Sequence, residues 1–313
     1  TPSINRNARR PVMVFVHGGG FRSGSGDAPT FDGRNLAAFG EVVVVTLNRR
    51  LNVLGFAALG SLGDEYADSA NAGQLDLVAA LQWMQANIES FGGDPSRVTL
   101  FGHSGGGSSI EILSIMPAAQ GLYHRTINMS GSSAFTIRTA EDLAPVAETF
   151  ATSLGAGRGR MHLLAEFTPD RLRAAYDAAL VAHGLPASDF RPVVDCRIIP
   201  HAPLTAGALA IGGHVPGIMS VTATEASAWL GADARNLTVP LAQVQTRVAA
   251  HFGISEHDAA QVLAAYREDS PARSPWDLLV AVTSDALVRI PQRRAIEIKA
   301  AAGLATVYAC EFA

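Results

Sequence analysis

Two short runs of this chain consist almost entirely of apolar residues, most of them β-branched. Residues 12–17 read VMVFVH and residues 42–47 read VVVVTL. A strand with one face in water alternates polar and apolar residues, whereas these runs are apolar on both faces. Strands buried on both faces occur almost only where helices cover a parallel sheet. The two runs therefore predict an α/β fold, with helices on both faces of a mostly parallel central sheet.

Four later segments also read as buried strands and extend this sheet. They are residues 97–101, 125–129, 215–221 and 304–312. Between the strands lie helical patterns, the clearest of which runs from Asn71 to Phe91 and stops before Gly92. Strands that alternate with helices are typical of parallel sheets.

The length of 313 residues is enough to bury a large core, and 48% of the residues are hydrophobic. We expect one catalytic α/β domain over residues 1–313. Helical insertions at about 135–214 and 235–275, without a core strand, are expected to cover one end of the sheet. A further helix over 276–302 should bend at Pro291.

Charge and composition narrow the range of partners. The net charge is −4 and no basic patch with interleaved aromatic residues occurs, so a nucleic-acid partner is not expected. No window approaches the roughly 18 apolar residues of a membrane helix. Cys196 and Cys310 are too few for a disulfide framework and lack metal-ligand spacing. The first residues contain no signal-peptide core, and the sequence leaves localisation and oligomeric state open.

The stretch VTLFGHSGGG, residues 98–107, carries the strongest signal for chemistry. It fits a strand, a tight turn centred on Ser104 and the start of a helix. Such a turn holds a serine clear of the sheet, between glycines, at a helix N-terminus that favours negative charge. The alternatives are a glycine-rich turn with an incidental serine, which leaves the flanking strand and helix unexplained, and a nucleotide loop. Neither G-x-G-x-x-G across this turn nor Gly-Lys-Ser/Thr anywhere is present.

The stretch VFVHGGGFRSGS, residues 14–25, supplies a second part. After a strand that ends at His17, three consecutive glycines present backbone N–H groups. An acyl-transfer enzyme needs two or three such donors aimed at the oxyanion of its intermediate. On its own this loop could be merely flexible, but together with Ser104 it favours an oxyanion loop.

At this point the chain resembles the type B carboxylesterases, the cholinesterase and para-nitrobenzyl-esterase branch of the α/β-hydrolase fold. The matching stretches are PVMVFVHGGGFRSGS, VVVVTLNRRLNVLGF, NAGQLDLVAALQWMQANIESFGGDPSRVTLFGHSGGGSS, YHRTINMSGS and PVVDCRIIP. The resemblance implies a carboxylic-ester hydrolase that uses a serine nucleophile, without a metal or cofactor, on a small-molecule ester. It also implies that Gly19, Gly20 and Gly105 donate the oxyanion N–H groups to an intermediate formed on Ser104.

The resemblance also points to the acid of the triad. The family's Thr-x-x-Glu-Gly stretch reads TATEASAW here, which gives the role to Glu225 with alanine in place of the glycine. Glu225 could instead cap the helix that follows, and Asp195 and Asp233 are weaker rivals. Three further departures are Arg49, where the family's NYRL has tyrosine, His103, where the family often has glutamate, and Cys196, where the family's PVVDG has glycine.

A histidine must take the proton of the serine, and in this fold it follows the acid along the chain. Only His251 and His257 do so, and both occupy surface positions of helices. His17 and His103 belong to the loop and the turn themselves. The resemblance places the histidine beyond a final strand, so we expect it downstream of residue 313, in a longer esterase that also begins before Thr1. A catalytically inactive cholinesterase-like binding protein, and a hydrolase of amides, lactones or carbamates, remain the alternatives.

Overall fold

The computed structural model describes residues 1–132, 137–187 and 189–312. The chain divides into two compact units. The first contains Thr1–Met219 and Ala295–Tyr308, and the second contains Ser220–Arg294 with the residues from Ala309 on. The single domain expected over residues 1–313 stays a prediction.

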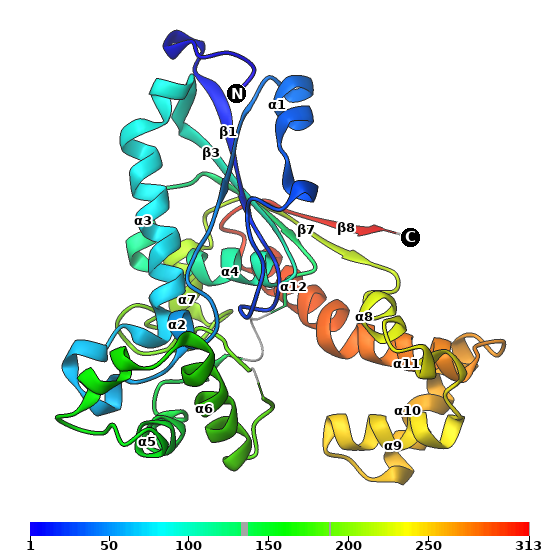
Figure 1. Ribbon diagram of the computed structural model, residues 1–313. Helices are drawn as coiled ribbons and strands as arrows, with labels where there is room; N and C mark the ends of the chain where they lie inside the picture. Colours follow the sequence, from blue (N-terminus) through cyan, green and yellow to red (C-terminus); the bar gives the residue numbers. More distant parts are fainter. Residues whose placement is uncertain (133–136, 188, 313) are drawn as a thin grey trace. The chain divides into compact units, whose positions relative to one another are not determined.

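A six-stranded sheet with the order β2-β1-β3-β4-β7-β8 runs through the described chain (Figure 1). Its strands are β1 Arg10–Val16, β2 Val43–Leu47, β3 Gly93–His103, β4 Arg125–Met129, β7 Gly217–Thr222 and β8 Val307–Phe312. β1 pairs in parallel with β2 and β3, and β3 with β4. All six predicted strands and the α/β class are confirmed. β3 begins four residues before its predicted start, because Gly93 pairs with Arg10 ahead of a register shift.

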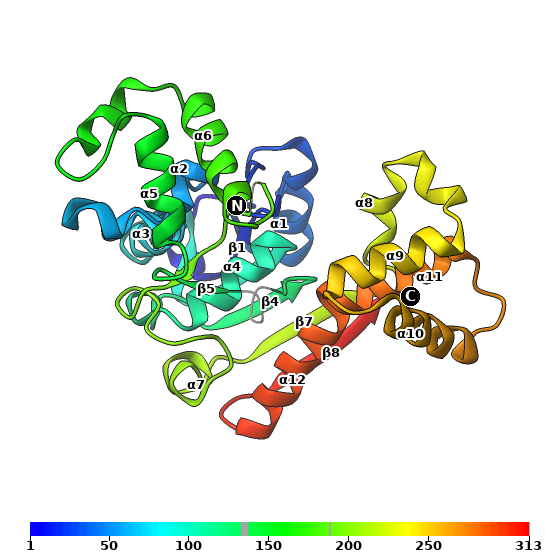
Figure 2. The same cartoon turned by 90° about the horizontal axis from the view of Figure 1, so that it is seen from below.

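The helices of the first unit lie between and beside these strands. They are α1 Arg34–Gly40, α2 Asn52–Phe56, α3 Ala72–Asn87, α4 Gly105–Ser114, α5 Ala144–Ser153, α6 Pro169–Ala182 and α7 Ala206–Gly212. The predicted helix over 71–91 is confirmed as α3 and a short 3-10 turn, Ile88–Phe91. It ends at Gly92 because a φ of 82° there stops the helix. Figures 1 and 2 show α3 and α1 on opposite sides of β1.

The apolar character of β1 on both faces has a direct structural cause. Val14 is fully buried in the cluster that also holds Ile112 of α4. On the opposite face the ring of Phe15 lies 4.5 Å from that of Phe31 and 5.1 Å from that of Phe101, centroid to centroid. Side chains thus cover both faces of the strand, which fixes its position in the middle of the layers.

The segment at about 135–214 contains α5, α6 and α7, and it also holds a small second sheet. That it covers one end of the large sheet stays a prediction. β5, Arg138–Thr139, pairs in parallel with β6, Val193–Val194. Strands of two residues are too short to show any periodicity, so the sequence did not indicate them. Phe150 and Tyr176 of this segment pack in a core cluster that also contains Phe21 and Phe56. Residues 135, 136 and 188 lie outside the described residues.

The second unit is helical beyond β7. Its helices are α8 Ser227–Gly231, α9 Leu241–Phe252, α10 Glu256–Asp269, α11 Pro275–Ser284 and the first turns of α12 Ile290–Ala302. Ahead of Pro291, where the sequence predicts a bend, the structure has a π-helical turn, Asp285–Arg289. Proline has no N–H group for the carbonyl of Leu287, which favours a wider turn at this place.

Candidate active site

Ser104 occupies the strained turn that the sequence predicts. It stands directly between β3 and α4, with φ 54° and ψ −122°, a backbone conformation that is rare for a residue with a side chain. Its N–H donates to the carbonyl of Met129 at 2.8 Å, and its carbonyl accepts from Ser108 at 2.9 Å. The residue is half-buried. Strain of this kind is typical of a nucleophile turn, where it presents the hydroxyl above the carboxyl edge of the sheet.

The glycines beside Ser104 allow α4 to approach the end of β1. A Cβ atom at Gly106 would lie 1.9 Å from the carbonyl oxygen of Val16, so no other residue fits there without a shift of the backbone. Glycine at this position therefore brings the N-terminus of α4 up to the loop that follows β1.

That loop, residues 18–21, turns through three consecutive left-handed residues. The φ angles are 101° at Gly19, 61° at Gly20 and 62° at Phe21. Glycine adopts this region at little cost, whereas Phe21 must be held in it. The N–H groups of Arg22 and Ser23 both donate to the carbonyl of Gly19, at 3.0 and 3.2 Å, which closes the turn.

The loop and the nucleophile turn are in direct contact. A Cβ built on Gly105 would lie 2.8 Å from the backbone nitrogen of Gly20. A Cβ built on Gly18 would lie 3.4 Å from the Cβ of Ser104. Four residues that the sequence assigned to the site, Ser104, Gly105, Gly19 and Gly20, are thus gathered in one place. Backbone amides from two separate loops meet beside the serine, which is the arrangement that an oxyanion hole needs.

Two polar side chains lie buried beneath the loop. The Nδ1 of His17 lies 2.8 Å from the carbonyl oxygen of Gly18, and Arg49 donates from Nη2 to the carbonyl of His17 at 3.3 Å. Burial is the largest cause that lowers the pKa of His17, and the nearby cation of Arg49 lowers it further. His17 is therefore neutral at neutral pH. The departure of Arg49 from the tyrosine of NYRL is visible in the sequence, but its contact with the loop is not.

Glu225 follows β7 in the second unit and is buried, with 9% of its surface exposed. Its Oε1 accepts the N–H of Thr222 at 2.6 Å. Helix α8 begins two residues later, and its N-cap residue, Ala226, makes no side-chain cap. A buried carboxylate on a loop after a strand is the setting that the acid of a triad requires.

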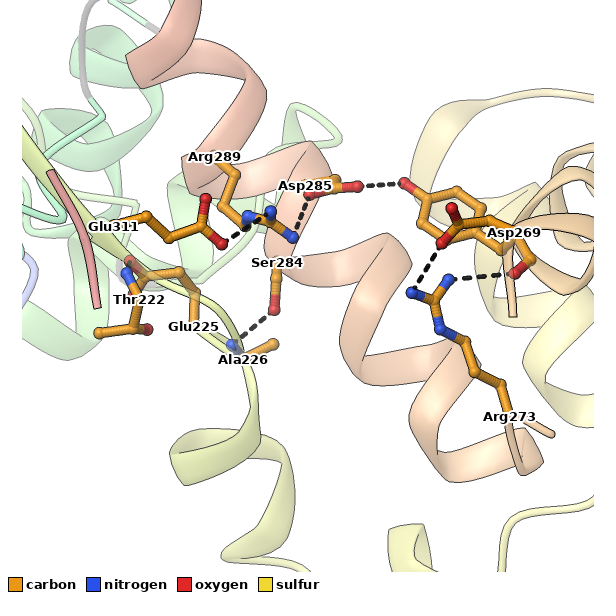
Figure 3. A network of polar contacts seen from close by, with 10 residues as sticks. Thr222, Glu225, Ala226, Asp269, Arg273, Ser284, Asp285, Arg289 and Glu311 are labelled. Carbon is orange, nitrogen blue, oxygen red and sulfur yellow. Dashed lines mark hydrogen bonds and ion pairs between the residues drawn. The ribbon is translucent and has the colours of Figure 1, made fainter. Parts of the chain in front are cut away.

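The loop of Glu225 is held by α11 (Figure 3). The hydroxyl oxygen of the fully buried Ser284 accepts the N–H of Ala226 at 2.9 Å. In the turn that follows, Arg289 pairs with Asp285 at 3.2 Å and with Glu311 of β8 at 3.1 Å. The sequence did not predict these contacts, because their residues lie about 60 residues or more from Glu225 along the chain.

The rival carboxylates have structural partners. Oδ1 of Asp195 accepts three successive backbone N–H groups, those of residues 197–199, at 2.8–3.0 Å. Asp233 pairs with Arg235 on the surface of the second unit. Hydrogen bonds from the Arg235 side chain and backbone lower the pKa of Asp233 to about 2. Each of these carboxylates thus already stabilises a local turn.

The two histidines that follow Glu225 along the chain lie on the surface of helices. His251 and His257 are exposed on α9 and α10, where His257 contacts Gln261 through Nε2 at 3.1 Å. Within the described part of the first unit, no histidine forms a hydrogen bond with the hydroxyl of Ser104.

Among the described residues, no three His, Cys, Asp or Glu side chains are grouped to hold a metal ion. Over these same ranges, every helix is too short or too polar to cross a bilayer.

Comparison with known proteins agrees with this geometry. A family model described as "Carboxylesterase family" matches residues 1–313. The chain belongs to the carboxylesterase family. It is 41% identical over 227 residues to a para-nitrobenzyl esterase of Bacillus subtilis, a match that covers 72% of this chain and 45% of that protein. Carboxylesterase 1F of Mus musculus is 46% identical over 156 residues, 50% of this chain and 27% of that protein.

Solved structures of the family share the fold. The carboxylesterase EST55 of Geobacillus stearothermophilus superposes with a TM-score of 0.84 at 32% identity, over 99% of this chain and 63% of that one. The α/β-hydrolase fold and the resemblance to type B carboxylesterases are thereby confirmed. The chain spans less than half the length of the Bacillus subtilis relative.

Proposed function

We propose that the complete protein hydrolyses small-molecule carboxylic esters through an acyl-enzyme formed on Ser104. The observation that carries this proposal is the contact between the strained turn of Ser104 and the glycine loop, with the Cβ positions of Gly18 and Ser104 only 3.4 Å apart. A serine with no adjacent oxyanion donors would gain little from its position in the turn, since stabilisation of the oxyanion is usually a large part of acyl-transfer catalysis.

In the proposed reaction, Oγ of Ser104 attacks the ester carbonyl carbon and its proton passes to a histidine base. The N–H groups of Gly19, Gly20 and Gly105 hold the negative oxygen. The carbon–oxygen bond then breaks, the histidine returns the proton to the leaving alcohol, and a water molecule hydrolyses the acyl-enzyme in a second, analogous step. No cofactor takes part in these steps.

Glu225 is proposed to orient the histidine and to stabilise its charged form. It lies in the second unit, whereas Ser104 lies in the first. The histidine itself is proposed to lie after residue 313. The roles of Glu225 and of this histidine can each be tested separately from that of Ser104.

Replacement of the nucleophile tests the proposal. In the protein expressed from its complete gene, Ser104→Ala should lower kcat/KM for p-nitrophenyl butyrate by roughly 10⁴-fold or more. Ser153→Ala removes a hydroxyl that caps the carbonyl of Phe150 in α5, and serves as the matched control. A wild-type protein that binds the ester without turnover would favour the binding-protein alternative. Turnover of an amide, lactone or carbamate instead of the ester would mean that another type of bond is hydrolysed, still with Ser104 as the nucleophile.

A further inference from the structure

Arg49 is buried with only 7% of its surface exposed, directly beneath the proposed oxyanion loop. No carboxylate pairs with it in the part of the chain that the structure describes. Among those residues, Nε and Nη1 also have no hydrogen-bond partner. Burial lowers the pKa of Arg49 to about 10, which still leaves it charged at neutral pH. An unpaired buried cation destabilises a fold. Its position at this place therefore suggests a role other than stability, and its two contacts indicate which.

Both contacts are made with the ends of the loop. Nη2 donates to the carbonyl of His17, the last residue before the glycines, at 3.3 Å. The guanidinium carbon lies 5.9 Å from the ring centroid of Phe21, the first residue after them, in a cation–π geometry. Arg49 itself follows β2, which pairs in parallel with β1. The guanidinium of Arg49, which follows the neighbouring strand β2, therefore contacts the residues on both sides of the three glycines.

The loop needs such a support because its backbone is under strain. Phe21 is a bulky residue at a φ of 62°, after two glycines that are also left-handed. The edge of the Phe56 ring, at 5.3 Å between centroids, and the N–H of Asn52, at 2.8 Å from the Phe21 carbonyl, hold it from other sides. Arg49 is the only one of these contacts that also reaches the residue before the glycines.

From these contacts we propose that Arg49 is a positioning residue, which fixes the glycine loop in the conformation that stabilises the oxyanion on Ser104. It does not touch the reacting atoms and acts through the backbone of residues 18–21. The inference rests on the proposed function for its catalytic consequence, but the restraint of the loop is a separate physical claim.

Three variants of the protein expressed from its complete gene test the inference. Arg49→Met keeps much of the side-chain volume and removes the charge and the hydrogen bond. Arg49→Lys keeps the charge but not the planar group. Arg34→Met makes the same change at an exposed arginine, whose side chain is 83% accessible. For each variant, kcat, KM, the melting temperature and the hydrogen exchange of peptides that cover residues 17–25 are measured.

We expect Arg49→Met to lower kcat by about 10- to 100-fold, with KM within about threefold of the wild-type value. Its melting temperature should be unchanged or higher, because an apolar residue replaces a buried unpaired cation. Exchange in the loop should become faster while the rest of the first unit is unaffected. Arg49→Lys should recover part of kcat, and Arg34→Met should match the wild type.

Several results would overturn the inference. One is a kcat for Arg49→Met within about twofold of wild type, and another is unaltered exchange in the loop. A fall in kcat that accompanies a lower melting temperature and faster exchange throughout the unit would assign Arg49 a structural role only. If the wild-type protein itself shows no turnover, the proposed function fails, and loop exchange alone then decides whether Arg49 restrains the loop.

Discussion

Ser104 and Phe21 both adopt left-handed backbone conformations that residues with side chains rarely occupy, and they lie on the two loops that meet at the site. Conformations of this kind cost about 1–3 kcal/mol each and persist only where the surroundings impose them. Their presence on two adjoining loops is best explained by a requirement for aligned backbone amides beside the serine.

The role of Glu225 is tested by a change that keeps its shape and removes its charge. Glu225→Gln should lower kcat by roughly 10³- to 10⁴-fold, because the neutral amide no longer orients the histidine or stabilises its cation. Steady-state kinetics with a p-nitrophenyl ester measures the effect. Asp233→Asn, the same change at an exposed rival in the second unit, is the control and should leave kcat within about twofold of wild type.

Retention of activity by Glu225→Gln to within about tenfold of wild type, combined with a large loss in Asp195→Asn, would transfer the acid role to Asp195. The three successive N–H groups that Asp195 accepts make this outcome unexpected, since they already satisfy one of its oxygens.

At the scale of single residues, the sequence predicted those that belong to short local motifs. Ser104, Gly19, Gly20 and Gly105 meet as expected, because a strand-turn-helix and a glycine run encode their own geometry. Arg49, Ser284 and Arg289 were not predicted in their supporting roles. Their partners are distant in sequence, and no local pattern records a contact that only the folded chain creates.

The strand–turn–helix element of β3 and α4 depends on close contact between α4 and the end of β1. Gly106→Ala tests this contact. In an open helix, alanine in place of glycine stabilises by about 0.5–1 kcal/mol. Here the added Cβ would lie 1.9 Å from the carbonyl oxygen of Val16. We expect the clash to prevail and to lower the free energy of unfolding by about 1–3 kcal/mol.

Urea denaturation followed by circular dichroism measures this difference. Gly157→Ala is the matched control, because nothing lies within 4 Å of a Cβ at that position and its φ is not in the left-handed region. A Gly106→Ala variant as stable as the wild type would show that α4 and β1 can separate at little cost.

Elements with strong patterns were predicted, and elements without them were not. The six strands of the large sheet and helix α3 follow from apolar runs and helical spacing. β5 and β6 have two residues each, too few for a pattern, and the π-helical turn before Pro291 has the composition of an ordinary helix. In each missed case the structure depends on neighbours that the local sequence does not specify.

At the scale of the whole molecule, the proposed nucleophile and the proposed acid belong to different units of the chain. Ser104 and its loop belong to the first unit, and Glu225 with its supporting helices belongs to the second. Membership of the carboxylesterase family follows from a match over residues 1–313.

The proposed activity depends on Ser104 as an activated nucleophile. The most direct measurement is the intact mass of the protein expressed from its complete gene, before and after treatment with a fluorophosphonate, followed by peptide mapping. We predict a single adduct on Ser104, and its absence after denaturation or in Ser104→Ala. A folded wild-type protein that remains unlabelled, or carries its adduct on another serine, would contradict the account.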